Sequence, residues 1–406
     1  MNTDSQSTYS KERIRFAVLS LFIAQGLCFA SWASRLPDIK NSFSADNYLH
    51  FGFLMFLIPI GKFVAIPLVG FLLPRIGSKK TVLISILGFA LSLFVVGIVH
   101  NIYFLGIILL LFGTFWNMTD ISINTQAIEV ERIYGKAIIA TFHAGWSLAA
   151  CIGAVIGYVM INIKITPTYH FIILSAIAVL IILINYKYLQ EPSTTIKESE
   201  ATRPSTASQK EQKRFKMPET ILIFLGIIWL LALVVENTMF EWSDVYFQSV
   251  IKAPESLQVG FLVFMIMMFT GRLLTNAAYR IWKKTTVLQI AGSLIFIGFL
   301  TSSIFIGASD SLTIKVIINS FGFMLIGLGI SCIVPTLYSI VGEKAKTPVG
   351  TALTIMSSIS FIGPLIAPLL VGFIAQHYKM EYAYLTIALF GACIVAIATF
   401  SKTLRK

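Results

Sequence analysis

The most regular feature of the sequence is the alternation of long apolar runs with short polar gaps. Because about 20 apolar residues cross the hydrocarbon core of a bilayer as a helix, each run predicts one membrane-spanning helix. Twelve such runs cover residues 15–36, 49–73, 81–99, 102–128, 137–161, 169–189, 218–247, 257–279, 285–307, 312–341, 348–376 and 381–401.

The longest polar stretch separates the sixth run from the seventh. Residues 191–216 are rich in Ser, Thr, Lys and Glu and carry too little apolar surface to fold. We therefore predict an N-terminal six-helix bundle at 1–190, a flexible cytoplasmic linker at 191–216 and a C-terminal six-helix bundle at 217–406. The segment that begins at Gly70, after the second run, has a weak echo 201 residues later at Gly271, after the eighth. This echo suggests halves related by an axis along the membrane normal.

Composition agrees with a membrane protein. Hydrophobic residues make up 56% of the chain and charged residues 12%, whereas a soluble domain carries about 25% charged residues. The net charge of +12 is spread over short gaps rather than gathered in one basic patch, so we expect no nucleic-acid partner. With both termini inside, 24 Lys and Arg lie in cytoplasmic segments and 6 in outer gaps. This bias predicts cytoplasmic termini, and the short polar start predicts that the first run is retained.

The turn after the second run contains Gly70, Arg75, Gly77 and Lys79, with Pro74 where an acidic residue would complete a known motif. In these residues the chain resembles the major facilitator superfamily. The resemblance implies an all-α membrane protein of twelve transmembrane helices in two six-helix bundles, acting as a monomeric secondary transporter without a cofactor. It also implies a conformational-switch loop, to which we assign the residues Gly70, Arg75, Gly77, Lys79, Gly271 and Arg272. Pro74 removes the contact that the acid makes in the family.

Further segments resemble the YbjJ-type bacterial branch of that superfamily, and this resemblance implies a location in a bacterial inner membrane. They are 30–37 (ASWASRLP), 142–147 (FHAGWS), Glu236 with Trp242-Ser243, and Gly271-Arg272. Drug:proton antiporters of the superfamily usually carry a Gly-Pro motif in helix five. Here that helix has Gly153 and Gly157 without proline, a small-residue packing face.

A polar stripe marks the fourth predicted helix. Gly113, Asn117, Asp120 and Asn124 are spaced i, i+4, i+7 and i+11, so they share one helical face. An ionisable residue at the bilayer centre costs at least about 2.5 to 3.5 kcal/mol and therefore normally faces a cavity or a partner. Asp120 is the clearest such residue in the sequence.

Depth matching gives Asp120 two partners. It lies 12 positions before the turn at Arg132, and His143 lies 11 positions after that turn. Lys62 lies 13 positions before Arg75 at the end of the second helix. At 1.5 Å per residue all three have a similar depth, so we predict a Lys62, Asp120 and His143 cluster. The cluster is either a proton-coupling site or a static salt bridge that holds helices two and four together.

The resemblance implies that helices one, four, seven and ten line a substrate cavity. Candidate cavity residues are Gln25, Trp32, Arg35, Asn117, Asn124 and Asn237. Alternatively, Trp32 is an interfacial belt residue and Arg35 reaches outward to water. Glu236 on helix seven is a second proton candidate, placed near the outer mouth by counting about 30 Å of helix from Lys216. We expect Glu241 and Asp244 beyond it to be solvated.

These features favour a transporter that moves a small polar organic solute, sugar-like or cell-wall-derived, by alternating access coupled to protons. Its partners would be the solute, protons and membrane lipids. The alternative is a proton-coupled efflux antiporter for amphipathic compounds. An intramembrane enzyme using Asp120 and His143 would need a nucleophile that no recognisable spacing supplies. A sensor without transport activity is a further possibility. The sequence contains no metal motif and no ATP-binding loop.

Overall fold

The computed structural model describes residues 9–44, 47–135, 138–190, 219–307 and 310–401. The predicted linker at 191–216 lies outside them. The chain divides into two compact units: Met1–Trp32, Leu57–Ile156 and Ile165–Arg214 form the first, and Ala33–Phe56, Gly157–Lys164 and Phe215–Lys406 form the second. Two ranges of the predicted N-terminal bundle, 33–56 and 157–164, are thus grouped with the second unit. The domain boundaries at 190 and 217 stay a prediction.

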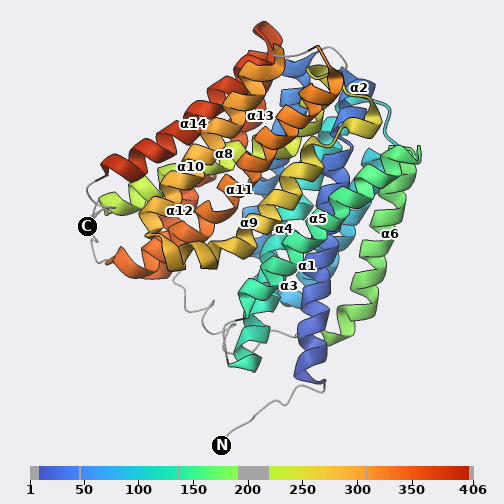
Figure 1. The fold of residues 1–406 in the computed structure, drawn as a ribbon. Helices are drawn as coiled ribbons and strands as arrows, with labels where there is room; N and C mark the ends of the chain where they lie inside the picture. The colour runs from blue at the N-terminus through green and yellow to red at the C-terminus, as the bar shows by residue number, and fades with distance from the viewer. Residues whose placement is uncertain (1–8, 45–46, 136–137, 191–218, 308–309, 402–406) are drawn as a thin grey trace, which may run out of the picture. The chain divides into compact units, whose positions relative to one another are not determined.

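The described residues are almost entirely helical and form no strand (Figure 1). Short 3-10 turns extend or connect three of the helices: η1 Tyr186–Tyr188, η2 Glu255–Leu257 and η3 Phe305–Gly307. The α-helices are α1 Lys11–Ser34, α2 Leu36–Ser44, α3 Tyr48–Val96, α4 Ile102–Tyr134, α5 Ile139–Asn162, α6 Pro167–Asn185, α8 Thr220–Ser249, α9 Gly260–Ile281, α10 Lys284–Ile304, α11 Leu312–Lys344, α12 Val349–Ser360, α13 Gly363–His377 and α14 Met380–Phe400.

Within the described residues, eleven helical segments are long and apolar enough to cross a membrane. One of them, α3, has 49 residues and contains two predicted spans. Its helical geometry breaks at Gly77, where φ is 79° and ψ is 164°, a left-handed backbone that favours glycine because a Cβ would clash there. Counting α3 twice gives the twelve predicted spans, and the predicted all-α membrane fold is confirmed.

Two details differ from the predicted pattern. The run at 348–376 is split into α12 and α13 just before Pro364, because a proline lacks the N–H and its ring clashes with the carbonyl four residues earlier. The polar gap after the first run contains a short helix, α2, which begins at Leu36. Pro37 fits its first turn because no intrahelical partner is needed for an N–H there.

Small residues set the helix contacts in each unit. In the first unit, α1 and α5 meet where a Cβ on Gly26 would lie 2.6 Å from the carbonyl oxygen of Trp146, and one on Gly153 would lie 2.7 Å from the Cβ of Ala30. The predicted small-residue face of α5 is therefore a packing face at Gly153. In the second unit, α10 packs against α14 (Figure 1), and a Cβ on Gly292 would lie 2.7 Å from the carbonyl oxygen of Gly391.

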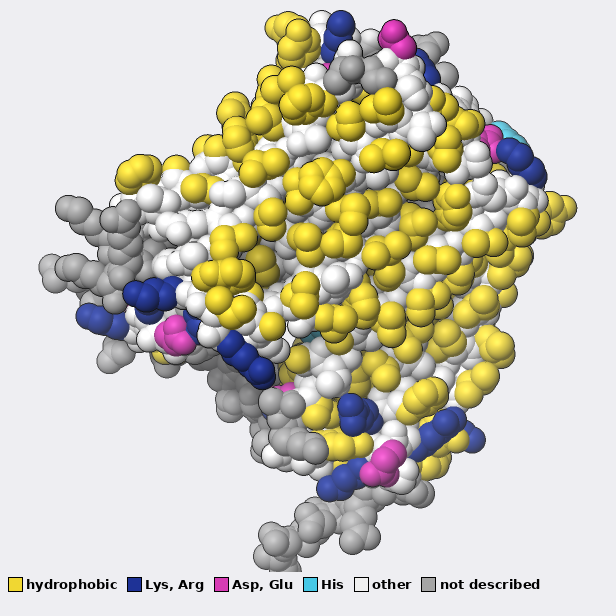
Figure 2. Space-filling view, in the orientation of Figure 1, with side chains coloured by type: hydrophobic (Ala, Val, Ile, Leu, Met, Phe, Trp, Pro, Cys, Tyr) yellow, Lys and Arg dark blue, Asp and Glu magenta, His cyan; other side chains and the backbone are white. Residues whose placement is uncertain are grey.

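The outer surface of the helices is apolar. In the face shown in Figure 2, hydrophobic side chains cover the sides of the helices, while charged side chains gather near helix ends. Large residues such as Leu91, Tyr103 and Leu183 are more than half exposed. Such a surface is unfavourable in water and suits contact with lipid chains. The chain is therefore an integral multi-pass membrane protein.

Candidate functional site

The polar stripe of α4 lies where α4 crosses α3 at close range. A Cβ on Gly113 would collide with the carbonyl oxygen of Ile58, and a Cβ on Gly61 would collide with that of Leu110. Because neither glycine carries a side chain, the two backbones approach directly. One turn further along, the Nδ2 of Asn117 donates a hydrogen bond of 2.7 Å to the carbonyl oxygen of Lys62. This geometry fixes Lys62 beside the polar face of α4.

The structure brings the predicted Lys62, Asp120 and His143 cluster together. Asp120 interacts electrostatically with both His143 from α5 and Lys62 from α3, and it forms a side-chain hydrogen bond with Gln25 from α1. Four helices of the first unit thus meet at one half-buried carboxylate. The predicted proximity of the three residues is thus present in the structure, while their depth in the membrane stays a prediction. We refer to Gln25, Lys62, Trp116, Asp120 and His143 as the Asp120 cluster.

Trp116 completes this cluster and was missed in the sequence. The Nζ of Lys62 lies 3.5 Å from the centroid of the Trp116 ring, a cation–π arrangement that stabilises an ammonium group away from bulk water. Trp116 precedes Asp120 by four residues, so both lie on one side of α4. That spacing was the available signal, but a tryptophan in a membrane helix is so often a packing residue that the spacing alone does not identify it.

An aromatic wall borders the Asp120 cluster. The rings of Phe29 and Trp116 lie 5.0 Å apart, and those of Phe29 and Trp146 lie 5.5 Å apart. The ring of Phe22 stands edge-on to the imidazole of His143 at 5.4 Å. These rings come from α1, α4 and α5. They give the charged groups an apolar surrounding, in which electrostatic interactions are stronger than in water.

Gln25 is the most deeply buried polar member of the cluster, with 2% of its surface exposed. Its Nε2 donates to the carbonyl oxygen of Trp116 at 3.4 Å. Its Oε1 accepts no hydrogen bond from any residue that the structure describes. A buried amide oxygen without a donor costs about 1 to 3 kcal/mol, so this position favours a hydrogen-bond donor supplied by a ligand or water.

The second unit contains another charged pair. The Nη2 of Arg272 on α9 lies 3.7 Å from the Oε1 of Glu236 on α8. Glu236 lies near the middle of α8, which extends from Thr220 to Ser249, and its position near the outer mouth stays a prediction. Arg272 is likewise inside a helix rather than in a loop. Asn237 donates to the carbonyl oxygen of Leu233 within α8.

The acidic residues beyond Glu236 were predicted to be solvated, and this prediction is wrong. Glu241 is 8% exposed and Asp244 is 7% exposed. The Oδ1 of Asp244 accepts a 2.8 Å hydrogen bond from the backbone N–H of Phe261, in the first turn of α9. Because the first N–H groups of a helix have no partner within it, Asp244 acts as a cap supplied by the neighbouring helix.

The remaining cavity candidates lie elsewhere. Trp32 is 2% exposed and packs on Phe112 at 5.2 Å, so it is a core residue rather than an interfacial belt residue. Arg35 is 3% exposed and pairs with Asp38 at 3.4 Å, so it does not reach outward to water. Burial raises the pKa of Asp38, and the guanidinium of Arg35 opposes this shift. Asn124 donates to the carbonyl oxygen of Asp120 at 2.8 Å.

The predicted switch-loop residues occupy different environments. The Nη1 of Arg75 donates to the carbonyl oxygen of Phe71 at 2.9 Å, and Lys79 lies 5.2 Å from the ring centroid of Tyr186. Gly70 is exposed, and a Cβ there would meet nothing within 4 Å. Gly271 differs sharply, because its Cβ would collide with the side chain of Ser331. The segments that begin at Gly70 and at Gly271 therefore do not make equivalent contacts.

Ser78 occupies a position where the family motif has a basic residue, and it joins a hydrogen-bond network. The Nε2 of Gln126 donates to the Oγ of Ser78 at 2.7 Å and to the carbonyl oxygen of Gln190 at 2.9 Å. The Oε1 of Gln126 accepts from the N–H of Gln190 at 2.9 Å. Gln126 is fully buried. One amide thus ties the turn after Gly77 to the end of the sixth span.

Multiple apolar spanning helices around a partly buried cluster of charged side chains are typical of a polytopic membrane transporter. The family model of the Major Facilitator Superfamily matches residues 17–349. The chain belongs to this superfamily. Since the family consists of secondary transporters that bind small molecules, the chain is a secondary transporter and not an enzyme.

Relatives and solved structures agree with this assignment. An uncharacterized transporter of Sinorhizobium fredii is 27% identical over 382 residues, covering 94% of this chain and 96% of the relative. An uncharacterized MFS-type transporter of Yersinia pestis is 28% identical over 381 residues, covering 94% and 93%. The crystal structure of the nucleoside transporter NupG aligns with a TM-score of 0.72 at 13% identity, covering 96% of this chain and all of that one. At this identity the likeness shows the fold alone.

Proposed function

We propose that this chain is a proton-coupled transporter of a small polar organic solute, sugar-like or cell-wall-derived, and that the Asp120 cluster is its coupling site. The observation that carries the proposal is the position of Asp120. Its carboxylate interacts with His143 and Lys62 and hydrogen-bonds with Gln25, inside helices that span the membrane. Intramembrane ionisable residues of this kind mark ion and proton pathways.

The charges of the cluster give a physical route to coupling. When Asp120 is ionised, it attracts Lys62 and a protonated His143; when it is neutral, both attractions are lost. Lys62 retains the face of Trp116 as a second partner, so it tolerates the neutral state of Asp120. Histidine changes charge near neutral pH. A solute that displaces one of these partners therefore changes the proton affinity of the carboxylate.

The surroundings of Asp120 fit a polar ring compound. Phe29, Trp116 and Trp146 supply apolar ring faces, and Gln25 supplies an amide oxygen that accepts no hydrogen bond from the described residues. Small-molecule sites combine a mostly apolar lining with a few placed polar groups in this way. Glu236, paired with Arg272, is proposed as the second ionisable group of the cycle.

The cellular location and the oligomeric state are proposed from the sequence and the family. The excess of Lys and Arg in alternate gaps supports cytoplasmic termini, and the resemblance to the YbjJ-type branch supports a bacterial inner membrane. The family supports a monomer. The resemblance to the YbjJ-type branch is part of this proposal. We expect no cofactor and no nucleic-acid partner.

The experiment has two steps. Thermal-shift screening of the purified protein against sugars, amino acids, peptides and cell-wall fragments first identifies a solute. Reconstitution in liposomes with an internal pH dye then measures solute-driven proton movement for the wild type and for Asp120→Asn. We expect the variant to lose the pH change. Glu129→Gln is the matched control, because Glu129 lies on the same helix but pairs with Arg132 instead.

Two outcomes would redirect the proposal. Undiminished proton movement in Asp120→Asn would show that the cluster is a static ion pair between α3, α4 and α5. A large thermal shift with a lipophilic cation and none with polar solutes would favour the efflux antiporter. Loss of the pH change in both Asp120→Asn and Glu129→Gln would mean that the assay responds to any lost carboxylate on α4, which would also remove the support for Asp120.

A further inference from the structure

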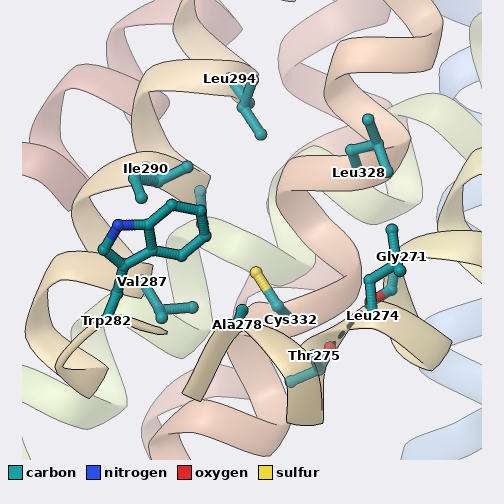
Figure 3. A pocket seen from close by; sticks show the side chains of 11 residues that line it. Gly271, Leu274, Thr275, Ala278, Trp282, Val287, Ile290, Leu294, Leu328 and Cys332 are labelled. Atoms are coloured by element: carbon teal, nitrogen blue, oxygen red, sulfur yellow. Dashed lines mark hydrogen bonds between the residues drawn. The ribbon is translucent and has the colours of Figure 1, made fainter. Parts of the chain in front are cut away.

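A cavity outside the Asp120 cluster lies on the surface of the second unit. It has a volume of about 130 Å³ and is formed by α9, the start of α10 and one face of α11. Figure 3 shows its lining, with Leu294 at one end, Trp282 and Val287 at the other, and the Sγ of Cys332 pointing into the space between Trp282 and Leu328. We call this cavity the α9–α10 groove.

The lining of the groove is apolar. Its one hydroxyl, that of Thr275, donates to the carbonyl oxygen of Gly271 at 2.9 Å and has no proton left to offer a ligand (Figure 3). A polar solute would lose its hydration there without replacement hydrogen bonds, which is unfavourable. An alkyl chain forms no hydrogen bonds with water, so it would lose none on entering the groove. The chemistry of the lining therefore selects a hydrocarbon ligand.

The groove opens where lipid chains are the solvent. Leu274 and Trp282 line it and are 54% and 45% exposed on the surface of the unit. Leu274 belongs to the segment Glu255–Ile281, which is long and apolar enough to span the membrane, and Trp282 directly follows that segment. An open apolar groove on a membrane-spanning helix is in contact with acyl chains from the bilayer.

A lysine follows in the sequence the residue at the Trp282 end of the groove. Lys283 follows Trp282 directly, is exposed, and occupies the position before the first residue of α10, four residues before Val287 in the lining. Its neighbour Lys284 is paired with Glu343, so that charge is balanced. Trp282 is an indole at the point where the apolar span ends, a typical interfacial position. Basic pockets between membrane helices near the cytoplasmic surface attract anionic lipid head groups.

We propose that the α9–α10 groove binds one acyl chain of an anionic phospholipid whose phosphate head group pairs with Lys283. The chain lies over Ala278 and Cys332, and the indole of Trp282 covers it near the interface. The site is independent of the Asp120 cluster, which belongs to the other unit. A negative result for lipid binding at the groove would therefore leave the proposed proton coupling unaffected.

The test uses the full-length protein in nanodiscs that contain phosphatidylglycerol with a photoreactive diazirine in its acyl chain. After illumination, mass spectrometry measures the cross-linked fraction of the peptides that carry Trp282 and Cys332. We expect both peptides to be labelled in the wild type. Unlabelled phosphatidylglycerol should suppress this labelling, and the same amount of phosphatidylcholine should suppress it several-fold less, because it lacks the net negative charge.

Variants separate the groove from the head-group site. Ala278→Trp fills the groove and should lower labelling about tenfold. Lys283→Gln should weaken phosphatidylglycerol binding about fivefold, the loss expected for one basic residue near an anionic surface. Lys80→Gln is the matched control, since Lys80 is an exposed lysine in the turn after Gly77 with no groove residue assigned beside it. It should leave labelling unchanged.

The results that overturn the proposal are equal labelling of the wild type and Ala278→Trp, or equal suppression by the two unlabelled lipids. Gel filtration checks that each variant is folded. Leu294→Trp fills the other end of the groove and replaces Ala278→Trp if the latter does not fold. The lipid competition uses the unmodified chain and decides the head-group preference even if neither variant can be purified.

Discussion

The crossing of α3 and α4 allows a sharp prediction with an internal control. Gly61 and Gly70 both lie within α3, but a Cβ on Gly61 would collide with the carbonyl oxygen of Leu110 and lie 2.8 Å from the N–H nitrogen of Thr114, whereas one on Gly70 would meet nothing within 4 Å. Alanine is favoured over glycine in a helix by up to about 1 kcal/mol. Gly70→Ala should therefore leave stability unchanged or raise it by that amount.

Gly61→Ala should have the opposite sign. Overpacking a tight contact costs about 1 to 3 kcal/mol, because the helices must move apart. The same movement lengthens the 2.7 Å hydrogen bond from Asn117 to the carbonyl oxygen of Lys62, which contributes about 0.5 to 1.5 kcal/mol. The gain in helix propensity is common to both variants and cancels, so adding the two costs we expect Gly61→Ala to be about 1.5 to 4.5 kcal/mol less stable than Gly70→Ala.

The measurement is equilibrium unfolding in mixed detergent micelles, followed by circular dichroism. Asn117→Ala in the wild type and in Gly61→Ala completes a double-mutant cycle. If Gly61→Ala already weakens the hydrogen bond from Asn117, we expect a coupling free energy of about 0.5 to 1 kcal/mol between the two substitutions. This value is in line with the modest strength of interhelical hydrogen bonds in membrane proteins. Equal stability of Gly61→Ala and Gly70→Ala would refute the direct backbone contact.

Three further predictions concern other contacts. Arg272→Gln should lower the free energy of unfolding by about 1 to 3 kcal/mol, which is less than the loss expected when one partner of a fully buried ion pair is removed. Adding Glu236→Gln should restore part of this loss in the same unfolding assay. Replacing Trp116 with leucine should cost about 0.5 to 2 kcal/mol more than replacing it with phenylalanine, which keeps a ring beneath the ammonium. The hydrogen bond from Thr347 lowers the pKa of Glu219 below its ordinary value of 4.5, so its stabilising contribution is present above pH 4.5 and is lost as the pH falls through the lowered pKa. The protection factor of the Thr347 amide, which compares the measured exchange rate with the intrinsic rate at the same pH, should fall over that range in the wild type and be low at every pH in Glu219→Ala.

Depth along the membrane could be predicted from the sequence because helical rise is constant and the turns are short. Counting from Arg75 and Arg132 placed Lys62, Asp120 and His143 at one level, and the structure brings them together. For Glu236 the count started from Lys216, whereas α8 begins at Thr220 and continues to Ser249. An error in one helix end moves every residue that is counted from it.

The direction in which a side chain points could not be predicted by counting. Trp32 lies on the helix that carries Gln25 and Arg35 directly follows that helix, yet Trp32 packs on Phe112 and Arg35 pairs with Asp38. The cap that Asp244 supplies to α9 depends on how two helices approach each other in space. Hydropathy shows that a residue lies in a membrane span. Which residues its side chain contacts depends on the rotation of the helix about its axis, which is set by packing at small residues.

Packing also bears on the choice between a coupling site and a structural lock at Asp120. The crossing of α3 and α4 is already fixed by the bare backbones at Gly61 and Gly113 and by the hydrogen bond of Asn117. A salt bridge between Asp120 and Lys62 adds little to that contact, because desolvating two charges offsets most of their attraction and apolar residues of similar size hold helices together as well. Charges that cost free energy without being needed for packing are best explained by a role in which they change. This reasoning favours coupling over a lock.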